Sequence, residues 1–382
     1  MHNHFRLAVL GLLTFFAITA HAKSSPDSSG AVYPSGVALP TFSDSVKGYA
    51  WANAASAPSY VPSPQYSYNA SGGGISISRS ETGRYSVTFA GLGSVAGSGH
   101  VQVSAYDTKA SCSTTGWGGA PSHLVVEVAC RNNLDALVDA RFTVMFVSSV
   151  GAADVSMAYA WAHDMLGASY TPSGIYSYNG TGGAITATRS ATGHYMMRFA
   201  GVGSLSGGHV QVTAYDSAAR CQPGGWNFTG TEQVISVRCF DAGGNPVDSR
   251  YTVLFLGFAD GNSGFAWANN ATSPSYTPAL SWSDNPNGPI TATRSTTGSY
   301  GLRFEGLGGA DYGGTVLVSA YGDTPATCNV GSWASSGNHF RTWTICFDPD
   351  DNLIDTPYTV LAVWPNRRTM HLFANGFENT VD

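Results

Sequence analysis

The sequence predicts an all-β protein built from three tandem antiparallel domains, each a β-sandwich or a small β-barrel of about seven short strands. Three observations lead to this prediction. Apolar residues alternate with polar ones, as on a half-buried strand. Clusters of Gly, Asn, Asp and Pro separate the alternating runs. The whole pattern also returns after 106 to 110 residues, as at Trp51, Trp161 and Trp267.

The first 22 residues have the features of a signal peptide. Arg6 supplies the positive start, an apolar run follows, and Ala20-His21-Ala22 is a small-x-small cleavage site. Residues 23–47 are rich in Ser, Gly and Pro without a regular pattern, which predicts a flexible leader. We therefore expect a secreted, extracellular protein, with the periplasm or the cell surface as alternatives. No later run is apolar enough to predict a transmembrane segment.

The repeats divide the remaining chain into domain 1 (48–150), domain 2 (151–260), domain 3 (261–365) and a C-terminal tail (366–382). The motif Arg-Ser-x-Thr-Gly-x-Tyr begins at Arg79, Arg189 and Arg294, and period-two strands follow it in each copy. The connections between copies are short. They predict neighbouring domains that touch and form a rod with limited bending.

Six cysteines fall two per repeat, always 18 positions apart. A zinc site does not fit them, because there is no Cys-x-x-Cys and no nearby histidine recurs in all three copies. In an exported protein the repeat symmetry selects one disulfide inside each domain, worth about 3 kcal/mol by loop entropy. The predicted pairs are Cys112–Cys130, Cys221–Cys239 and Cys328–Cys346.

The opening Tyr-Ala-Trp-Ala, the Arg-Ser-x-Thr-Gly-x-Tyr motif and the run from Cys239 to Arg250 together resemble a tandem-repeat family of secreted bacterial proteins. The resemblance spans residues 48–364. It implies export and the repeat boundaries, and it transfers no activity and no site. The ending Phe373-Ala374-Asn375-Gly376-Phe377-Glu378 is similar to a short GFE-type tail of other exported bacterial proteins.

An arginine and an aspartate recur at matching positions of every copy. A structural ion pair explains both, because a charge repeated three times is what a shared fold requires. The alternative is a polar pocket in which the arginine fork holds a carboxylate or a sugar. The candidate pairs are Arg79 with Asp139, Arg189 with Asp248, and Arg294 with Asp355.

Aromatic residues suggest a second kind of site, because an exposed ring can stack on a sugar. Trp117, Trp226 and Trp333 each lie five residues after a cysteine, which favours packing against the disulfide. Aromatic residues in polar loops are better candidates for ligand binding, with half-burial as the alternative. These candidates are Tyr66, Tyr68, Tyr176, Tyr178 and Trp282.

The carboxylates of Asp348, Asp350 and Asp351 crowd one turn and form a weak calcium candidate, although copies one and two have fewer acids there. A solvated hairpin turn is the favoured interpretation. Otherwise no metal and no cofactor is expected.

No catalytic residue is predicted, because the sequence has no nucleophile elbow, no His-Glu-x-x-His and no phosphate-binding glycine loop. The net charge of -6 disfavours nucleic-acid binding. We therefore expect a non-catalytic, multivalent binder of a glycan or another cell-surface polymer. The alternative is a structural or adhesive spacer of the cell surface, and the third hypothesis is an extracellular hydrolase whose site has no recognisable motif.

Overall fold

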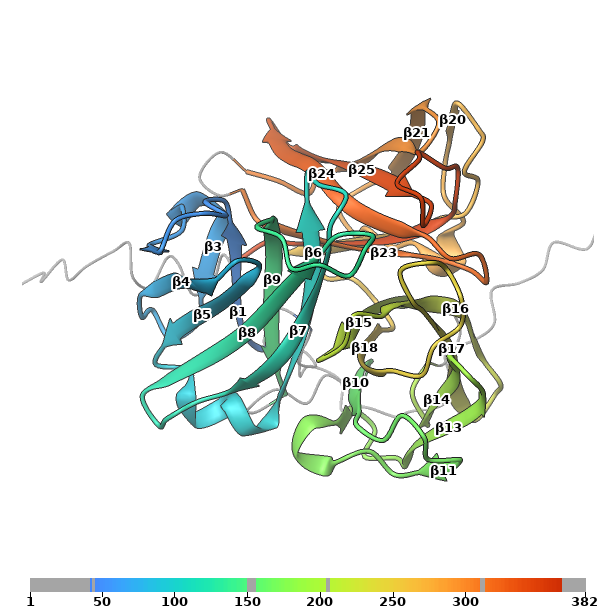
Figure 1. The fold of residues 1–382 in the computed structure, drawn as a ribbon. Coiled ribbons are helices and arrows are strands. Elements are labelled where there is room, and N and C mark those ends of the chain that lie inside the picture. Colours follow the sequence, from blue (N-terminus) through green and yellow to red (C-terminus); the bar gives the residue numbers. More distant parts are fainter. Residues whose placement is uncertain (1–41, 43–44, 150–155, 204–206, 310–312, 366–382) are drawn as a thin grey trace, which may run out of the picture. The chain divides into compact units, whose positions relative to one another are not determined.

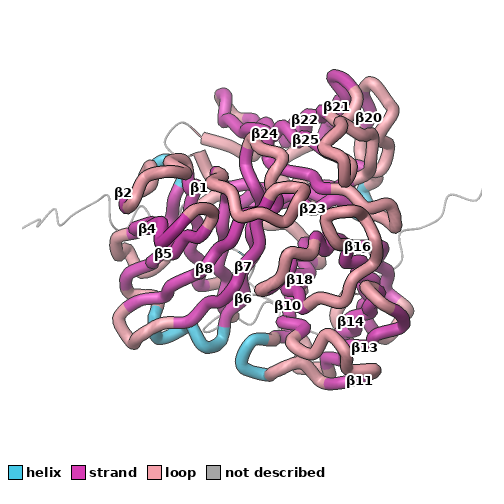
Figure 2. The backbone as a smooth tube through the Cα atoms, viewed as in Figure 1, coloured by secondary structure: helices cyan, strands magenta, loops and turns pink. Residues whose placement is uncertain are grey.

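The computed structural model describes residues 42, 45–149, 156–203, 207–309 and 313–365. The predicted signal peptide, most of the predicted leader and the tail lie outside these residues. The described chain is all-β, and its few helical segments are short 3₁₀ turns (Figure 2). They are η2 (Pro64–Tyr66), η3 (Gly93–Ser98), η4 (Gly174–Tyr176) and η5 (Leu280–Trp282).

Each repeat is a sandwich of two antiparallel sheets, which decides between the sandwich and the barrel (Figure 1). We call them the inner and the outer sheet. In repeat 1 the inner sheet has the order β3 (Ser67–Asn69), β1 (Val46–Ala52), β9 (Arg141–Ser148), β6 (Gly99–Tyr106). The outer sheet has the order β2 (Ser59–Tyr60), β4 (Ile75–Glu81), β5 (Arg84–Ala90), β8 (His123–Arg131), β7 (Ser111–Gly118).

The other two repeats follow the same order, except that the inner sheet of repeat 3 has three strands. The inner sheet of repeat 2 is β12 (Tyr178–Asn179), β10 (Met157–Ala162), β18 (Arg250–Leu256), β15 (His209–Tyr215), and its outer sheet is β11 (Ser169–Tyr170), β13 (Ile185–Ala191), β14 (His194–Ala200), β17 (Glu232–Phe240), β16 (Arg220–Phe228). The inner sheet of repeat 3 is β19 (Ser263–Ala268), β26 (Tyr358–Val363), β23 (Thr315–Ala320), and its outer sheet is β20 (Ser275–Tyr276), β21 (Ile290–Thr296), β22 (Ser299–Glu305), β25 (His339–Phe347), β24 (Thr327–Ser336).

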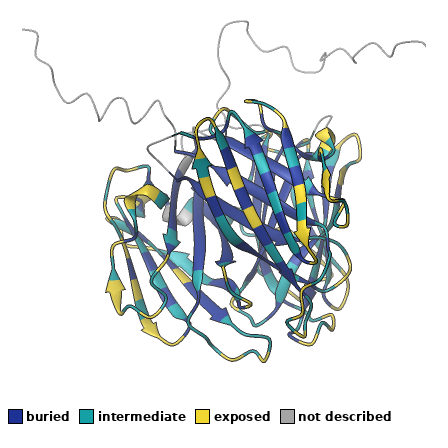
Figure 3. Cartoon of the chain, turned by 90° about the horizontal axis from the view of Figure 1, so that it is seen from above, coloured by how far each residue is buried: buried dark blue, intermediate teal, exposed yellow. Residues whose placement is uncertain are grey.

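The core of each repeat lies between its two sheets and follows from the alternation in the sequence. In repeat 1, Val87 and Phe89 of the outer sheet face Val144 and Phe146 of the inner sheet, and all four are fully buried. Buried and exposed residues therefore alternate along the strands of the outer sheets (Figure 3). Burial of these side chains is the main stabilising term of each domain.

The inner sheets differ, because their second face is buried as well. Tyr49 and Met145 from repeat 1, Tyr159 from repeat 2, and Phe265 and Leu361 from repeat 3 share one apolar cluster. The three inner sheets therefore pack against one another. The predicted rod is wrong for this reason: a rod would expose most of this apolar face to water.

Main-chain hydrogen bonds join the three repeats, and each repeat is bonded to both of the others. The amide of Asp107 donates to the carbonyl of Val330, linking repeats 1 and 3 at 2.7 Å. At the equivalent position Asp216 donates to Thr114, which links repeats 2 and 1 at 2.9 Å. The third equivalent bond, from Gly322 to Pro223, links repeats 3 and 2, also at 2.9 Å.

The predicted flexible leader ends too late. Strand β1 begins at Val46, and Lys47 is buried with its ammonium 2.6 Å from the carbonyl oxygen of Phe42. Phe42 itself belongs to the apolar cluster between the inner sheets. The end of the predicted leader is therefore part of the folded structure.

Candidate functional site

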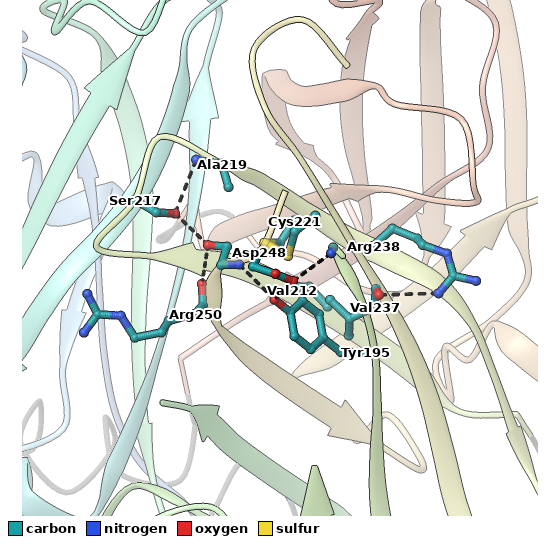
Figure 4. The surroundings of a disulfide bond; sticks show 12 residues. Tyr195, Val212, Ser217, Ala219, Cys221, Val237, Arg238, Asp248 and Arg250 are labelled. Atoms are coloured by element: carbon teal, nitrogen blue, oxygen red, sulfur yellow. Dashed lines mark hydrogen bonds between the residues drawn. A yellow bond between two sulfur atoms is a disulfide. The ribbon is translucent and has the colours of Figure 1, made fainter. Parts of the chain in front are cut away.

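The three predicted disulfides are confirmed. In each repeat the two cysteines lie directly opposite each other in the outer hairpin, with their Cα atoms 4.1 Å apart. Cys221 lies close to Tyr195 and Asp248 in Figure 4. Each disulfide thus fixes the outer hairpin beside the recurring aspartate.

The recurring arginine and aspartate of each repeat form a two-pronged ion pair. In repeat 2 the Arg189 Nε lies 2.9 Å and its Nη2 2.7 Å from the two carboxylate oxygens of Asp248. The Gly193 amide and the Tyr195 hydroxyl also donate to Asp248. The hydrogen bonds from Arg189 lead the causes that lower the pKa of Asp248 to about 2. The equivalent pairs are Arg79 with Asp139 and Arg294 with Asp355.

A tyrosine of the recurring motif completes this cluster, in a role that the motif alone does not predict. The Tyr195 hydroxyl donates a hydrogen bond to Asp248 and accepts one from the amide of Ser249. Tyr85 and Tyr300 make the same contacts in their own repeats. The cluster therefore ties the β13–β14 hairpin, and its equivalents, to the segment before the last strand. Its hydrogen-bonding groups are used inside the protein, which fits a structural role better than a ligand pocket.

The loop aromatics join the repeats. Tyr66 packs edge-on against Trp51 of its own repeat and Trp333 of repeat 3, with ring centroids 5.3 Å and 5.5 Å apart. Tyr106 completes a group of four rings. Trp333 was expected to pack on its disulfide, but it reaches across the interface between repeats. The equivalent groups are Trp161, Tyr176, Tyr215 with Trp117, and Trp267, Trp282, Tyr321 with Trp226.

The other two loop candidates are also half-buried. The ring of Tyr68 lies 5.7 Å from that of Tyr49, and the ring of Tyr178 lies 5.6 Å from that of Tyr159. Both partners belong to the apolar cluster between the inner sheets. Tyr68 and Tyr178 thus pack on the edge of this cluster, while Tyr66, Tyr176 and Trp282 pack at the repeat interfaces.

The acidic turn is organised by its own backbone. The Asp348 carboxylate accepts the amides of Asp350 and Asn352 at 2.9 Å and 2.8 Å, which is the pattern of an Asx turn. The carbonyl oxygen of Asp351 accepts a bond from Lys109 of repeat 1. Within the described residues, no group of three or more His, Cys, Asp or Glu is arranged to hold a metal ion.

A small cavity lies where strands from all three repeats meet. Hydroxyls of Ser104, Thr213 and Ser319 line it, and each is bonded to a neighbouring repeat. Arg220 also lines it and donates to the carbonyl of Asn132 in repeat 1, at 2.7 Å. These groups hold the repeats together, so the cavity is a junction of the scaffold.

Two histidines that match each other in the sequence, His100 and His209, are fully buried between repeats. Burial lowers the pKa of each to about 3. Each imidazole is therefore neutral near pH 7 and out of reach of a substrate. Neither can serve as the base of a catalytic triad.

The outer sheet of repeat 3 carries an aromatic residue that the repeat analysis did not single out. Trp343 lies on β25 and is 38% exposed. It pairs across the sheet with Gly301 of β22, and its indole nitrogen is 3.9 Å from where a Cβ on Gly301 would lie. The ring therefore lies beside a strand position that has no side chain.

Basic residues occupy the next row on the same face. Arg341 is exposed and pairs across the sheet with Arg303. The equivalent of Trp343 is Glu127 in repeat 1 and Ser236 in repeat 2. Trp343 does not recur in the other two copies, so the repeat pattern does not indicate it. Alternation along β25, which places Trp343 on the face opposite to buried Thr342, could have found it.

No protein-family model matches the chain, and comparison with the curated proteins gives no match. Among the described residues, no helix is long and apolar enough to cross a membrane.

Proposed function

We propose that this protein is a non-catalytic extracellular protein that binds a polysaccharide through the outer sheet of repeat 3. The observation that carries the proposal is Trp343, an exposed tryptophan on a strand that is paired on both sides, next to Gly301. An indole face can pack on the apolar face of a sugar ring, and burying it contributes about 1.5–3 kcal/mol.

The scaffold supports this function by holding Trp343 rigidly. The Cys328–Cys346 disulfide joins β24 to β25 three residues away. Strands β22 and β24 flank β25 on both sides. A site on rigid strands loses little conformational entropy when it binds its ligand.

The two other repeats do not repeat the site. Glu127 accepts a hydrogen bond from Ser86 where repeat 3 has Trp343 and Gly301. The proposal therefore places the main site in repeat 3, and the avidity of three similar modules is not needed for it.

A structural or adhesive role is the second candidate. It is favoured by the loop aromatics, which pack between repeats. Under this hypothesis the outer sheet of repeat 3 carries no ligand, and changing Trp343 leaves every binding property intact.

A pull-down on insoluble cellulose, chitin and peptidoglycan tests the proposal with residues 23–382. We expect retention of the natural chain on at least one polymer and about tenfold weaker binding by Trp343→Ala, because its stacking surface is lost. Glu127→Ala is the matched control, since it changes the equivalent position of repeat 1, and it should bind normally. If the natural chain is retained on none of these polymers and binds no acidic polysaccharide either, the structural role replaces the proposal.

A further inference from the structure

The charged residues around Trp343 indicate which kind of polysaccharide the site would bind. Arg341 lies two residues before Trp343 on the same exposed face, so the two side chains are about 7 Å apart along the strand. Arg303 lies opposite Arg341 on the neighbouring strand. Two arginines thus lie beside the aromatic ring in a protein whose net charge is -6.

The two arginines differ in their surroundings. Arg303 forms an ion pair with Glu305, and its Nη2 lies 3.4 Å from Nδ1 of His339. Arg341 makes no ion pair within the described part of the chain. Its guanidinium therefore remains available to an external anion, whereas the charge of Arg303 is balanced by Glu305.

Repeats 1 and 2 show that the fold does not require a charge here. The position of Arg341 is occupied by Val125 in repeat 1 and by Val234 in repeat 2. Arg341 and Trp343 thus depart together from the pattern of the other copies, on the same exposed face. A shared requirement of the sheet does not explain this joint change, whereas a shared ligand does.

We infer that the outer sheet of repeat 3 binds an acidic polysaccharide, with Trp343 packing on a sugar ring and Arg341 pairing with a carboxylate of the same chain. This inference rests on the proposed function. A planar guanidinium matches a carboxylate with two parallel hydrogen bonds, and such charge-assisted bonds are about twice as strong as neutral ones. A neutral polymer would use the tryptophan alone.

The test compares polygalacturonate with its methyl ester, which keeps the sugar backbone and removes the charge. Affinity of residues 23–382 for each polymer is measured by affinity electrophoresis at low and high salt. We expect about tenfold tighter binding to the acid than to the ester, and a loss of this difference at high salt.

The variants separate the two contributions. Arg341→Gln should weaken binding to the acid by about tenfold and leave binding to the ester unchanged, while Arg341→Lys should fall between. Trp343→Ala should weaken both. Arg84→Gln, which changes a half-buried arginine on the outer sheet of repeat 1, is the control and should change neither. Circular dichroism checks that each variant is folded.

Two results would overturn the inference differently. Equal binding of acid and ester, or an Arg341→Gln variant that binds the acid normally, rejects the acidic ligand and leaves the polysaccharide function standing. Binding to neither polymer, together with no retention on cellulose, chitin or peptidoglycan, rejects the polysaccharide function itself.

Discussion

At the scale of single residues, the buried histidines make the protein sensitive to acid. The Nε2 atoms of His100 and His209 contact the side-chain amides of Gln102 and Gln211, and each ring stacks on an aromatic ring of the next repeat. Burial lowers the pKa of both histidines from 6.5 to about 3. As pH falls through this window, the unfolded chain binds protons that the folded chain excludes, so stability is full above about pH 6.5 and decreases below it.

Repeat 3 supplies the test, because it has Thr315 at the equivalent position. We expect the natural chain to lose about 1.4 kcal/mol of unfolding free energy per histidine and per pH unit between about pH 6 and 4.5. The double variant His100→Thr/His209→Thr should lose little over the same range. Urea unfolding at several pH values measures this. Equal pH dependence in the two proteins would show that these histidines are not the cause.

The aspartates of the ion pairs do not confuse this measurement. The pKa of Asp248 and of Asp355 is lowered to about 2 from 3.8, chiefly by the paired arginine. The stability that these carboxylates contribute is complete above about pH 4 and is lost only as pH falls further. Acid unfolding therefore has two stages with different causes, the histidines first and the carboxylates later.

At the scale of elements, the hairpin β24–β25 carries two tryptophans with opposite roles. Trp333 is 7% exposed, and its indole nitrogen donates to the carbonyl of Gly313 at 2.7 Å. Trp343 faces solvent on the adjacent strand. The same hairpin thus fastens repeat 3 to repeat 1 with one ring and presents the other.

We expect Trp333→Ala to lower the free energy of unfolding by about 3–5 kcal/mol, because it leaves a cavity in the four-ring group and an unpaired carbonyl. Trp343→Ala should cost about 1 kcal/mol, because the indole is partly exposed and leaves no buried cavity when it is removed. Chemical denaturation of both variants measures the difference. Similar losses would mean that Trp343 also has a structural role.

The sequence predicted the elements better than it predicted their surroundings. Alternation placed the strands through Tyr85, Val87 and Phe89, and repeat symmetry placed the disulfides. Alternation does not predict the surroundings of β6, where His100, Gln102 and Ser104 have the polar pattern of a solvent-exposed face. These side chains are buried between repeats and bonded there, and a single strand's pattern cannot distinguish water from a polar neighbour. Trp343 was missed for the opposite reason: it occurs once, and recurrence selects what the fold needs.

At the scale of the whole described chain, the three repeats should unfold together. The apolar cluster between the inner sheets contains residues from all three, so unfolding one repeat exposes the inner faces of the other two. We expect one calorimetric transition with a calorimetric to van't Hoff enthalpy ratio of about 1.

We expect a single repeat to be unstable when it is separated from the other two. Residues 156–262 alone would expose Tyr159, Leu254 and Leu256, so this fragment should aggregate or unfold at temperatures where the whole chain is stable. Size-exclusion chromatography and thermal unfolding check this. A stable monomeric fragment, or three separate transitions in the whole chain, would contradict the shared core.

The hydrogen bonds between repeats have one more consequence. The hydroxyl of Thr213 donates to Gln102 of repeat 1, and the hydroxyl of Ser319 donates to Gln211 of repeat 2. Repeat 3 has Leu317 where the other repeats have these glutamines. The equivalent hydroxyl of repeat 1, on Ser104, therefore donates to a main-chain carbonyl of repeat 3 instead. Contacts that recur head to tail around three copies are those of a ring-shaped homotrimer, whose subunits must all be identical. Joining the three copies in one polypeptide removes that requirement. Each copy is then free to change by itself, so a tryptophan and an arginine can arise on one face without being imposed on the other two.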